Sequence, residues 1–377
     1  MTKTTILVLF SYGMSATRWQ QMGILEKEKV IFEAYLANGL AQRVLWFTYD
    51  PADEVLIAQM QQEGRLDRGI EVIPVPTWLS RPGGKLLYSL LGPWCRRSWF
   101  RQADAMINHQ TSGSWTGIIA KLIGHGRFVY RYGHSLWRRH LDRRQYGRLA
   151  FSWPLDRLAM AVSDHALVCT QTDYRQTSQG RGVSLCPNFI DTDDGLMAVP
   201  EPIAQRVARG VFVGRLMPFK NLFHLIEACH QQGLGLDLYG DGPLKAGLQA
   251  HVQSLGADCR FLGVKPNREL RVALRQYRYF FLVSNYEAMP KALLEGLAAG
   301  CVSVVSPNYG CAEIVEDGVT GFISADWSVA AIAAAIARAK TADQARISQA
   351  AVRLVEQQYS LKRVMALHRH ALLGEAL

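Results

Sequence analysis

The sequence predicts an α/β protein with two doubly wound parallel sheets. Its 377 residues exceed the length that one hydrophobic core usually serves, so two domains are expected. Short apolar runs of strand length alternate with helix-forming stretches, and this alternation is typical of parallel sheets. One unit shows the whole pattern: an apolar strand over 279–283, a polar turn, a helix over 291–299 and a second strand over 302–305.

The predicted first domain, residues 1–192, begins with an apolar strand. The turn Ser11-Tyr12-Gly13-Met14 follows this strand, and Gly13 would let the backbone approach a ligand there. A helix over 26–38 ends at Gly39, a common residue after a helix end. The predicted strands of this domain cover 5–10, 43–48, 71–75, 105–109, 128–131, 166–170 and 183–186.

A linker over 193–208 is expected to lead into a second domain over 209–350. The first strand of this domain ends at Gly214, and the strands over 236–239 and 259–263 each lead into a tight turn. Three amphipathic helices are predicted near the C-terminus, over 330–339, 343–357 and 361–372.

The composition indicates a globular protein that meets phosphate groups. The net charge of +10 suits a nucleotide, a lipid headgroup or a nucleic acid, and composition does not choose among them. Seven cysteines form no Cys-x-x-Cys pair and cannot all pair with one another, which favours a reducing, cytoplasmic compartment. No apolar segment approaches the roughly 18 residues that span a bilayer, so we expect a soluble protein or one attached to a membrane surface.

Two acids mark the strand–helix–strand unit described first. Glu287 lies in the turn and Glu295 in the helix, eight residues later. At the carboxyl end of a parallel strand both would face the crevice where open α/β sheets bind ligands, beside a helix N-terminus that favours anions. Carboxylates accept hydrogen bonds from the hydroxyls of a ribose or a hexose, while the helix end receives phosphate.

In this setting the Glu-x7-Glu pattern resembles the retaining glycosyltransferases of family 4, which have the GT-B fold. The likeness is broad over 210–322 and weaker but continuous before it. It implies two Rossmann-like domains facing a cleft with the active site, and a C-terminal helix within 351–377 that packs back on the first domain. One departure is Ala288, where the family usually has Gly, and Ala is small enough that we expect the site to survive.

A phosphate cradle is predicted at the start of the second domain. Gly214 permits close approach, and Arg215 and Lys220 lie beside a helix N-terminus, as a diphosphate requires. Their spacing also fits two surface cations, but with the acid pair the cradle is preferred. The resemblance adds the turns at Gly242 and Gly263. The expected donor-binding residues are Gly13, Gly214, Arg215, Lys220, Gly242, Gly263, Glu287, Ala288, Met289, Pro290 and Glu295.

The acceptor-side candidates lie at two strand ends of the first domain. Many family members carry a His after the strand that here leads through Arg131 to Gly133 and His134, and the family's position fits either of the last two. His134 could orient the donor or the acceptor, and a hydrogen-bonded surface histidine is equally compatible. His109 ends the neighbouring strand. The acceptor side is therefore predicted as His109, Arg131 and His134, and the catalytic set as Glu287, Arg215, Lys220 and His134.

The tripeptide Asp191-Thr192-Asp193 has a rival interpretation as a metal site, because Asp-x-Asp binds metal in the other common glycosyltransferase fold. There the motif ends a strand, whereas here it follows a Pro-Asn turn and leads into the linker. A solvated loop is preferred, and neither a metal nor another cofactor is expected.

Two basic stretches remain. Residues 85–101 mix Trp94, Trp99 and Phe100 with arginines, a composition typical of an interfacial helix, and residues 138–148 add five arginines. A solvated face and contact with an anionic membrane are the two interpretations, and nucleic acid is not expected as a partner because no binding module is present.

The residues and the resemblance together predict a metal-independent glycosyltransferase in the cytoplasm, either free or associated with the inner face of the cell membrane. Retention of configuration is what the resemblance implies. The enzyme would move a hexose from a UDP- or GDP-sugar to a glycan or lipid-linked acceptor, in bacterial cell-surface polysaccharide or glycolipid synthesis. The alternatives are a sugar-nucleotide epimerase of the same fold, and a basic membrane- or nucleic-acid-binding protein without catalysis. A phosphorylase would need a pyridoxal-phosphate lysine, and no lysine has that context.

Overall fold

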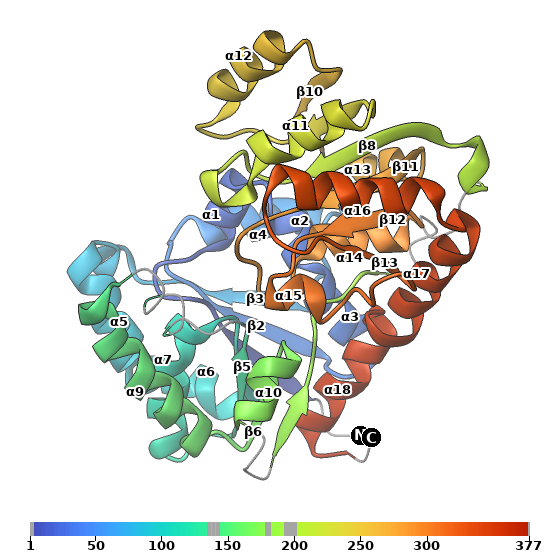
Figure 1. Cartoon of the computed structure of the whole chain (residues 1–377). Coiled ribbons are helices and arrows are strands. Elements are labelled where there is room, and N and C mark those ends of the chain that lie inside the picture. Colours follow the sequence, from blue (N-terminus) through green and yellow to red (C-terminus); the bar gives the residue numbers. More distant parts are fainter. Residues whose placement is uncertain are drawn as a thin grey trace. The chain divides into compact units, whose positions relative to one another are not determined.

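The computed structural model describes residues 4–133, 137, 140, 144–177, 182–191 and 202–375. The chain forms two compact units, each with its own parallel sheet (Figure 1). The N-terminal unit comprises Met1–Cys186 and Met365–Leu377, and the C-terminal unit comprises Pro187–Val364. The predicted fold class, two doubly wound parallel sheets, is confirmed.

The sheet of the N-terminal unit has seven parallel strands in the order β3-β2-β1-β4-β5-β6-β7. The order reverses between β1 and β4, the kind of switch point where such sheets bind ligands. Every strand predicted for this half is present, within two or three residues at each end. The strands are β1 Thr5–Leu9, β2 Arg43–Phe47, β3 Ile70–Ile73, β4 Ala105–Asn108, β5 Arg127–Tyr132, β6 His165–Val168 and β7 Val183–Leu185.

The helices of this unit differ from expectation at one point. The single helix predicted over 26–38 is divided into two helices that meet at Lys29. The backbone hydrogen bonds continue across this residue, since its N–H donates to Leu25 and its carbonyl accepts from Phe32 and Glu33. The helices are α1 Ala16–Gln21, α2 Leu25–Glu28, α3 Val30–Ala37, α4 Asp53–Gln62, α5 Pro82–Cys95, α6 Arg97–Gln102, α7 Ser114–Leu122, α9 Tyr146–Val162 and α10 Gln171–Thr177.

The last helix, α18 (Leu361–Leu373), returns to the N-terminal unit as predicted. His368 lies 2.5 Å from the hydroxyl of Tyr35, and Arg127 donates to the carbonyl of Ala371 over 2.6 Å. Burial lowers the pKa of His368 to about 3, so its imidazole is neutral where it packs. These contacts join the end of the chain to the sheet and helix of the first unit.

The sheet of the C-terminal unit has six parallel strands in the order β10-β9-β8-β11-β12-β13. The first strand begins at Val207, inside the range predicted as linker, and β13 was not predicted. The strands are β8 Val207–Val213, β9 Leu236–Tyr239, β10 Cys259–Gly263, β11 Tyr277–Leu282, β12 Val302–Val305 and β13 Gly321–Ile323. The helices are α11 Leu222–Gln231, α12 Lys245–Leu255, α13 Asn267–Leu274, α14 Lys291–Ala298, α15 Tyr309–Ala312, α16 Val329–Thr341 and α17 Gln344–Gln358.

The core of this unit explains why the strand–helix–strand segment over 279–305 is so apolar. Strand β11 lies in the middle of the sheet, and Phe280 and Phe281 are both fully buried, one on each face. Gly296 lets α14 lie directly on the ring of Phe280, since a Cβ there would approach the ring to 2.5 Å. The turn after β11 is therefore held between a central strand and a closely packed helix.

Candidate functional site

Two loops at the carboxyl edge of the C-terminal sheet are joined by hydrogen bonds. The loop after β8 ends in the short 3-10 helix η4, Pro218–Lys220, which is capped by Asn221 in the left-handed conformation with φ of 52°. The amide of Asn221 donates to the carbonyl of Val283 over 3.1 Å and also bonds Asn285. The N–H of Asn285 donates to the carbonyl of Phe219 over 2.7 Å. The loop after β8 is therefore fastened to the turn after β11.

This fastening brings Lys220 and Glu287 together, although 67 positions separate them in the chain. They form an ion pair, and their side chains are only 13% and 14% exposed. Arg215 is exposed and makes no ion pair with any residue that the structure describes. The edge therefore carries one cation offset by a neighbouring acid and one cation with its charge available to an anion.

Glycines allow the loops after β8 and β9 to lie against each other. Gly214 donates to the carbonyl of Tyr239 over 3.0 Å, and Gly240 to that of Gly263 over 2.8 Å. A Cβ on Gly240, whose φ is 142°, would lie 1.9 Å from the carbonyl oxygen of Gly214. Gly242 is similarly close to the backbone of Leu216. Sequence reasoning singled out Gly214, Gly242 and Gly263 but missed Gly240, which lies beside Gly242 in the same turn.

We expect Gly240→Ala to lower the free energy of unfolding by about 3 kcal/mol, since a side chain there combines a strained φ with a backbone clash. Gly233→Ala is the control, because Gly233 also has a positive φ, 60°, but open space around it, and should cost about 1 kcal/mol. Urea denaturation followed by circular dichroism measures both. Equal losses in the two variants would contradict the close approach of the two loops.

The turn from Glu287 to Pro290 is supported by residues that the sequence did not single out for this role. A Cβ on Gly310 would lie 2.3 Å from the carbonyl oxygen of Ala288, so the start of α15 packs directly beneath the turn. The amide of Asn188 donates to the carbonyl of Met289 over 2.7 Å. Pro290 directly precedes α14, which begins at Lys291 as predicted.

Glu295 lies in α14 and is almost fully buried, at 4% exposed. Its carboxylate accepts a hydrogen bond of 2.9 Å from the amide of Asn267, the first residue of α13. The structure thus places Lys220 and Glu287 in direct contact and gives Glu295 a different set of neighbours. Asn267 is the residue that sequence reasoning missed here, and its only signal is the Pro-Asn step that begins the helix.

The first-domain candidates lie in the N-terminal unit. Gly13 takes a φ of 73° in the turn after β1. His109 is buried, with Nε2 3.0 Å from the carboxylate of Glu28 and its ring 4.8 Å from that of Trp19. Arg131 lies in β5, where its backbone is bonded on both sides by the side chain of Asn108, and His134 lies outside the described residues. His109 is therefore paired with an acid that was not predicted.

Three further expectations concern metals, thiols and membrane-spanning helices. Asp191 offers its carbonyl to Arg271 over 2.8 Å, while the other two residues of the Asp-x-Asp tripeptide lie outside the described residues. Across the described part of the chain, no group of three His, Cys, Asp or Glu side chains could hold a metal ion. Burial raises the pKa of Cys301 and of Cys311 to about 12, so neither is a thiolate at neutral pH. No helix among the described residues is long and apolar enough to cross a bilayer.

Two family models match the chain. Residues 33–194 match the model described as Glycosyltransferase Family 4, and residues 201–356 match that of Glycosyl transferases group 1. The Vi polysaccharide biosynthesis protein VipC/TviE of Salmonella typhi is 34% identical over 31% of this chain and 21% of its own length. The amylovoran biosynthesis glycosyltransferase AmsK of Erwinia amylovora is 32% identical over 33% of this chain and 34% of its own. The aligned stretches therefore span about a third of these curated relatives or less.

Solved structures show the same fold across the whole chain. Sucrose-phosphate synthase from Thermosynechococcus elongatus aligns with a TM-score of 0.74 at 17% identity, covering 99% of this chain and 100% of the other. Anabaena HepE in complex with UDP and glucose aligns with a TM-score of 0.69 at 17% identity, with the same coverage. At such identities these alignments establish the fold alone.

The two sheets and these alignments define a GT-B fold. On it the chain carries glycosyltransferase-family regions in both halves, Family 4 in the first and group 1 in the second.

Proposed function

We propose that this chain is a retaining glycosyltransferase that transfers a hexose from a UDP- or GDP-sugar to a glycan or lipid-linked acceptor. The observation that carries the proposal is the contact of Lys220 with Glu287 at the carboxyl edge of the C-terminal sheet, with Arg215 exposed on the same loop as Lys220. Cations and an acid at this edge suit a nucleotide-linked sugar. The matched families and the UDP and glucose bound by HepE support the same donor class.

The proposed roles follow from the charges. Arg215 and Lys220 would bind the diphosphate and stabilise the negative charge that grows on it as the glycosyl C–O bond breaks. Glu287 would then exchange part of its contact with Lys220 for hydroxyls of the sugar, and Glu295 would accept from the ribose. In a front-face route the departing phosphate oxygen takes the acceptor's proton, which needs no enzymatic nucleophile. With two cations in this role, the reaction needs no metal, and chelation by EDTA should leave turnover unchanged.

The curated relatives are named for the biosynthesis of Vi polysaccharide and of amylovoran, and we propose a polysaccharide acceptor for the present chain as well. The defining experiment is a thermal-shift panel of UDP, GDP and ADP with their sugars, followed by a transfer assay with the donor that binds. One nucleotide should raise the melting temperature, and the product should keep the donor's anomeric configuration. Isomerised donor without transfer would instead show a sugar-nucleotide epimerase, and no stabilisation by any nucleotide would contradict the proposal.

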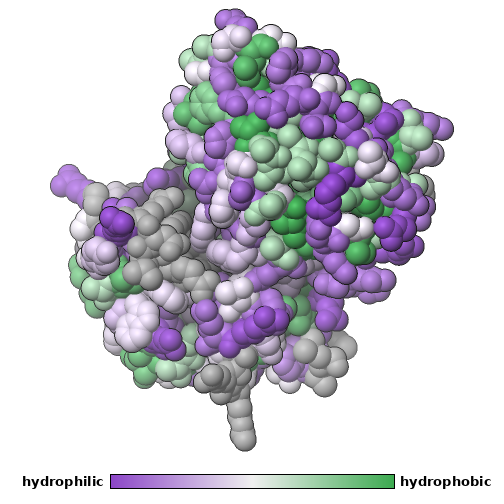
Figure 2. Space-filling model, in the orientation of Figure 1, coloured by the Kyte–Doolittle hydropathy of each residue, from purple (hydrophilic) through white to green (hydrophobic). Residues whose placement is uncertain are grey.

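A surface of the N-terminal unit supports contact with a membrane. The basic stretch over 85–101 forms α5 and α6 rather than one helix, with Phe100 buried and Trp94 exposed. Apolar side chains line one stripe of α5 at helical spacing, and others lie on α9. Figure 1 shows α5, α7 and α9 packed side by side, and Figure 2 shows apolar atoms over this region at the lower left. The exposed apolar residues are Leu86, Leu87, Leu90, Leu91 and Trp94 on α5, and Tyr146, Phe151, Trp153 and Leu158 on α9.

Exposed cations occur on α6, which follows α5 in the chain, and on α9. Arg97 and Arg101 on α6 and Arg148 on α9 are exposed, while Arg138, Arg139 and Arg143 lie outside the described residues. Exposed apolar groups flanked by arginines suit an anionic bilayer, with each cation near the surface contributing about 1 kcal/mol. We propose that this surface holds the protein at the inner face of the cell membrane, close to a lipid-linked acceptor.

The double variant Leu87→Glu with Leu91→Glu is expected to abolish binding to vesicles of phosphatidylcholine with about a third phosphatidylglycerol. Two new negative charges would oppose both the apolar contact and the anionic headgroups. Sedimentation of protein with the vesicles measures the bound fraction, and Val55→Glu on α4, another exposed apolar position in the same unit, is the control. Equal sedimentation of wild type and double variant would assign the stripe to an ordinary solvated face.

A further inference from the structure

A cavity of 270 Å³ lies in the N-terminal unit between α9 and α10. It opens beside Tyr132, the last residue of β5, and α10 begins shortly after the end of the neighbouring strand β6. The cavity is therefore at the carboxyl edge of the sheet, where open α/β sheets bind ligands. Its volume is just below the roughly 300–1,000 Å³ of typical small-molecule sites, which suits one ring.

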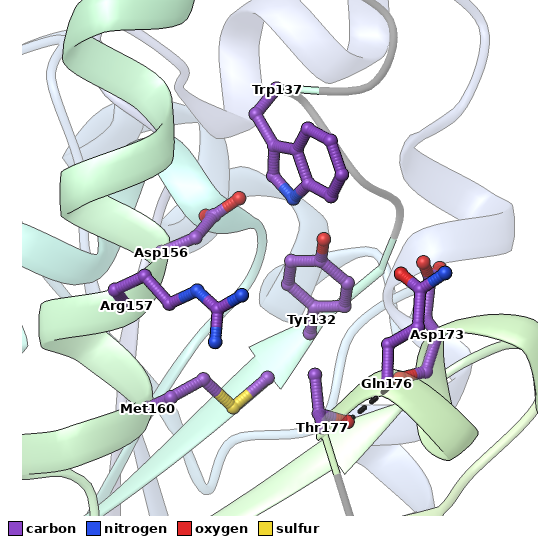
Figure 3. Close-up of a pocket in the computed structure, with 8 residues that line it drawn as sticks. All are labelled: Tyr132, Trp137, Asp156, Arg157, Met160, Asp173, Gln176 and Thr177. Carbon is purple, nitrogen blue, oxygen red and sulfur yellow. Dashed lines mark hydrogen bonds between the residues drawn. The ribbon is translucent and has the colours of Figure 1, made fainter.

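The lining combines aromatic rings with hydrogen-bonding groups. Figure 3 shows Trp137 above and Tyr132 in the middle, with polar side chains of α9 and α10 on opposite sides of the space between them. Such a set offers a flat apolar face together with several donors and acceptors. The lining residues are Tyr132, Trp137, Asp156, Arg157, Met160, Asp173, Gln176 and Thr177.

Asp156 is the residue that points to a ligand. The residue is only 4% exposed, and its Oδ1 accepts a hydrogen bond of 2.7 Å from the hydroxyl of Tyr130. Its Oδ2 is also buried and has no hydrogen-bond partner among the described residues. A buried oxygen without a partner has lost its hydrogen bonds to water, and a ligand hydroxyl could replace them. In Figure 3 the carboxyl group of Asp156 is turned toward Trp137.

The charge balance limits the chemistry of that ligand. Burial first, and then the nearby Asp173, raise the pKa of Asp156 to about 7, so its carboxyl group is partly protonated at neutral pH. A phosphate or carboxylate would be repelled by these two acids. Arg157 also lines the cavity and supplies a positive charge there, so a cationic ligand is not needed to neutralise the two acids. A neutral group that both donates and accepts hydrogen bonds, such as a hydroxyl, satisfies Asp156 in either protonation state.

We propose that this cavity binds one neutral sugar ring of the acceptor glycan, with its hydroxyls on Asp156 and Gln176 and its apolar face on Trp137. The assignment to an acceptor rests on the proposed glycosyltransferase function, whereas the binding of a sugar ring rests on the cavity itself. Both helices that line the cavity belong to the N-terminal unit, so the site needs no residue of the C-terminal unit.

Saturation-transfer NMR tests the proposal with methyl glycosides of glucose, galactose, mannose and N-acetylglucosamine, and with methyl glucosaminide as a cationic probe. At least one neutral glycoside should receive saturation from the wild-type protein. Asp156→Asn, which keeps the shape and can keep the bond with Tyr130, and Gln176→Ala, at an exposed position, should each weaken binding at least fivefold. Asp164→Asn is the control, since Asp164 lies just before the amino end of β6.

Three results would each overturn the proposal. The protein could saturate no neutral glycoside, it could saturate the cationic probe alone, or the cavity variants could bind as well as the wild type. Thermal shifts with UDP on the same samples separate it from the proposed function. UDP binding without glycoside binding would remove the sugar site and leave the donor site. Glycoside binding lost on Asp156→Asn, but with no nucleotide bound, would support the sugar site and contradict the transferase.

Discussion

Lys220→Ala is expected to lower turnover about 100-fold or more, equivalent to about 2.7 kcal/mol of transition-state stabilisation. The lysine would neutralise charge that develops on the leaving diphosphate, so its loss affects the transition state more than the bound donor. Arg215→Ala should have an effect of similar size. It should also raise the KM for the donor more, because the exposed Arg215 has no acid to occupy it in the described part of the chain. Initial rates over a range of donor concentrations separate the two parameters.

Lys340→Ala is the matched control for these variants. Lys340 belongs to the same unit but bonds the carbonyl of Gln232, at the end of α11, and its loss should leave turnover within about twofold of wild type. Circular dichroism and melting temperature verify that each variant is folded. Near-normal turnover in both Lys220→Ala and Arg215→Ala would contradict the diphosphate cradle.

Glu287→Gln is expected to reduce transfer about 100-fold while nucleotide binding persists. The amide keeps the size of the carboxylate, but it removes the acid that holds Lys220 and that would accept two sugar hydroxyls. The free nucleotide carries no transferable sugar, so it makes no contact with Glu287 that the variant could remove. Lys220 would also be released from its ion pair, so UDP or GDP should bind as well as before or better. Isothermal titration with the nucleotide and with the intact nucleotide-sugar distinguishes the two contributions.

The companion variant Glu295→Gln should have the opposite profile. The carboxylate of Glu295 is buried against Asn267, and in the proposed arrangement it faces the ribose. Its replacement should therefore weaken the binding of the free nucleotide. If the two glutamine variants bind the nucleotide with equal affinity, and the nucleotide-sugar with equal affinity, then Glu287 and Glu295 do not contact different parts of the donor.

Local patterns in the sequence were enough to predict every strand except β13. Strand β11 is apolar because both of its faces are buried, and the turn after it is polar because it leaves the sheet. Gly300 marks the end of α14 because its φ of 70° is one that other residues rarely adopt. Such features depend on neighbours within about ten positions, so they can be found without knowing the fold. The boundary at Lys29 has no signal in the sequence, because the helix pattern and the backbone hydrogen bonds both continue across it.

Only the tertiary structure decided which of the candidate residues meet. Residue spacing cannot show that Asn221 bonds the turn after β11, and it is this bond that places Lys220 against Glu287. The tight approach of Gly240 to Gly214 and the pairing of His109 with Glu28 likewise join segments that are distant in the chain. The unpartnered oxygen of Asp156 has no signal in the sequence, because burial and hydrogen bonding are properties of the packed neighbours rather than of the residue. The residues of the candidate site could thus be predicted from the sequence, whereas their contacts are determined by how the sheet edges and helices pack.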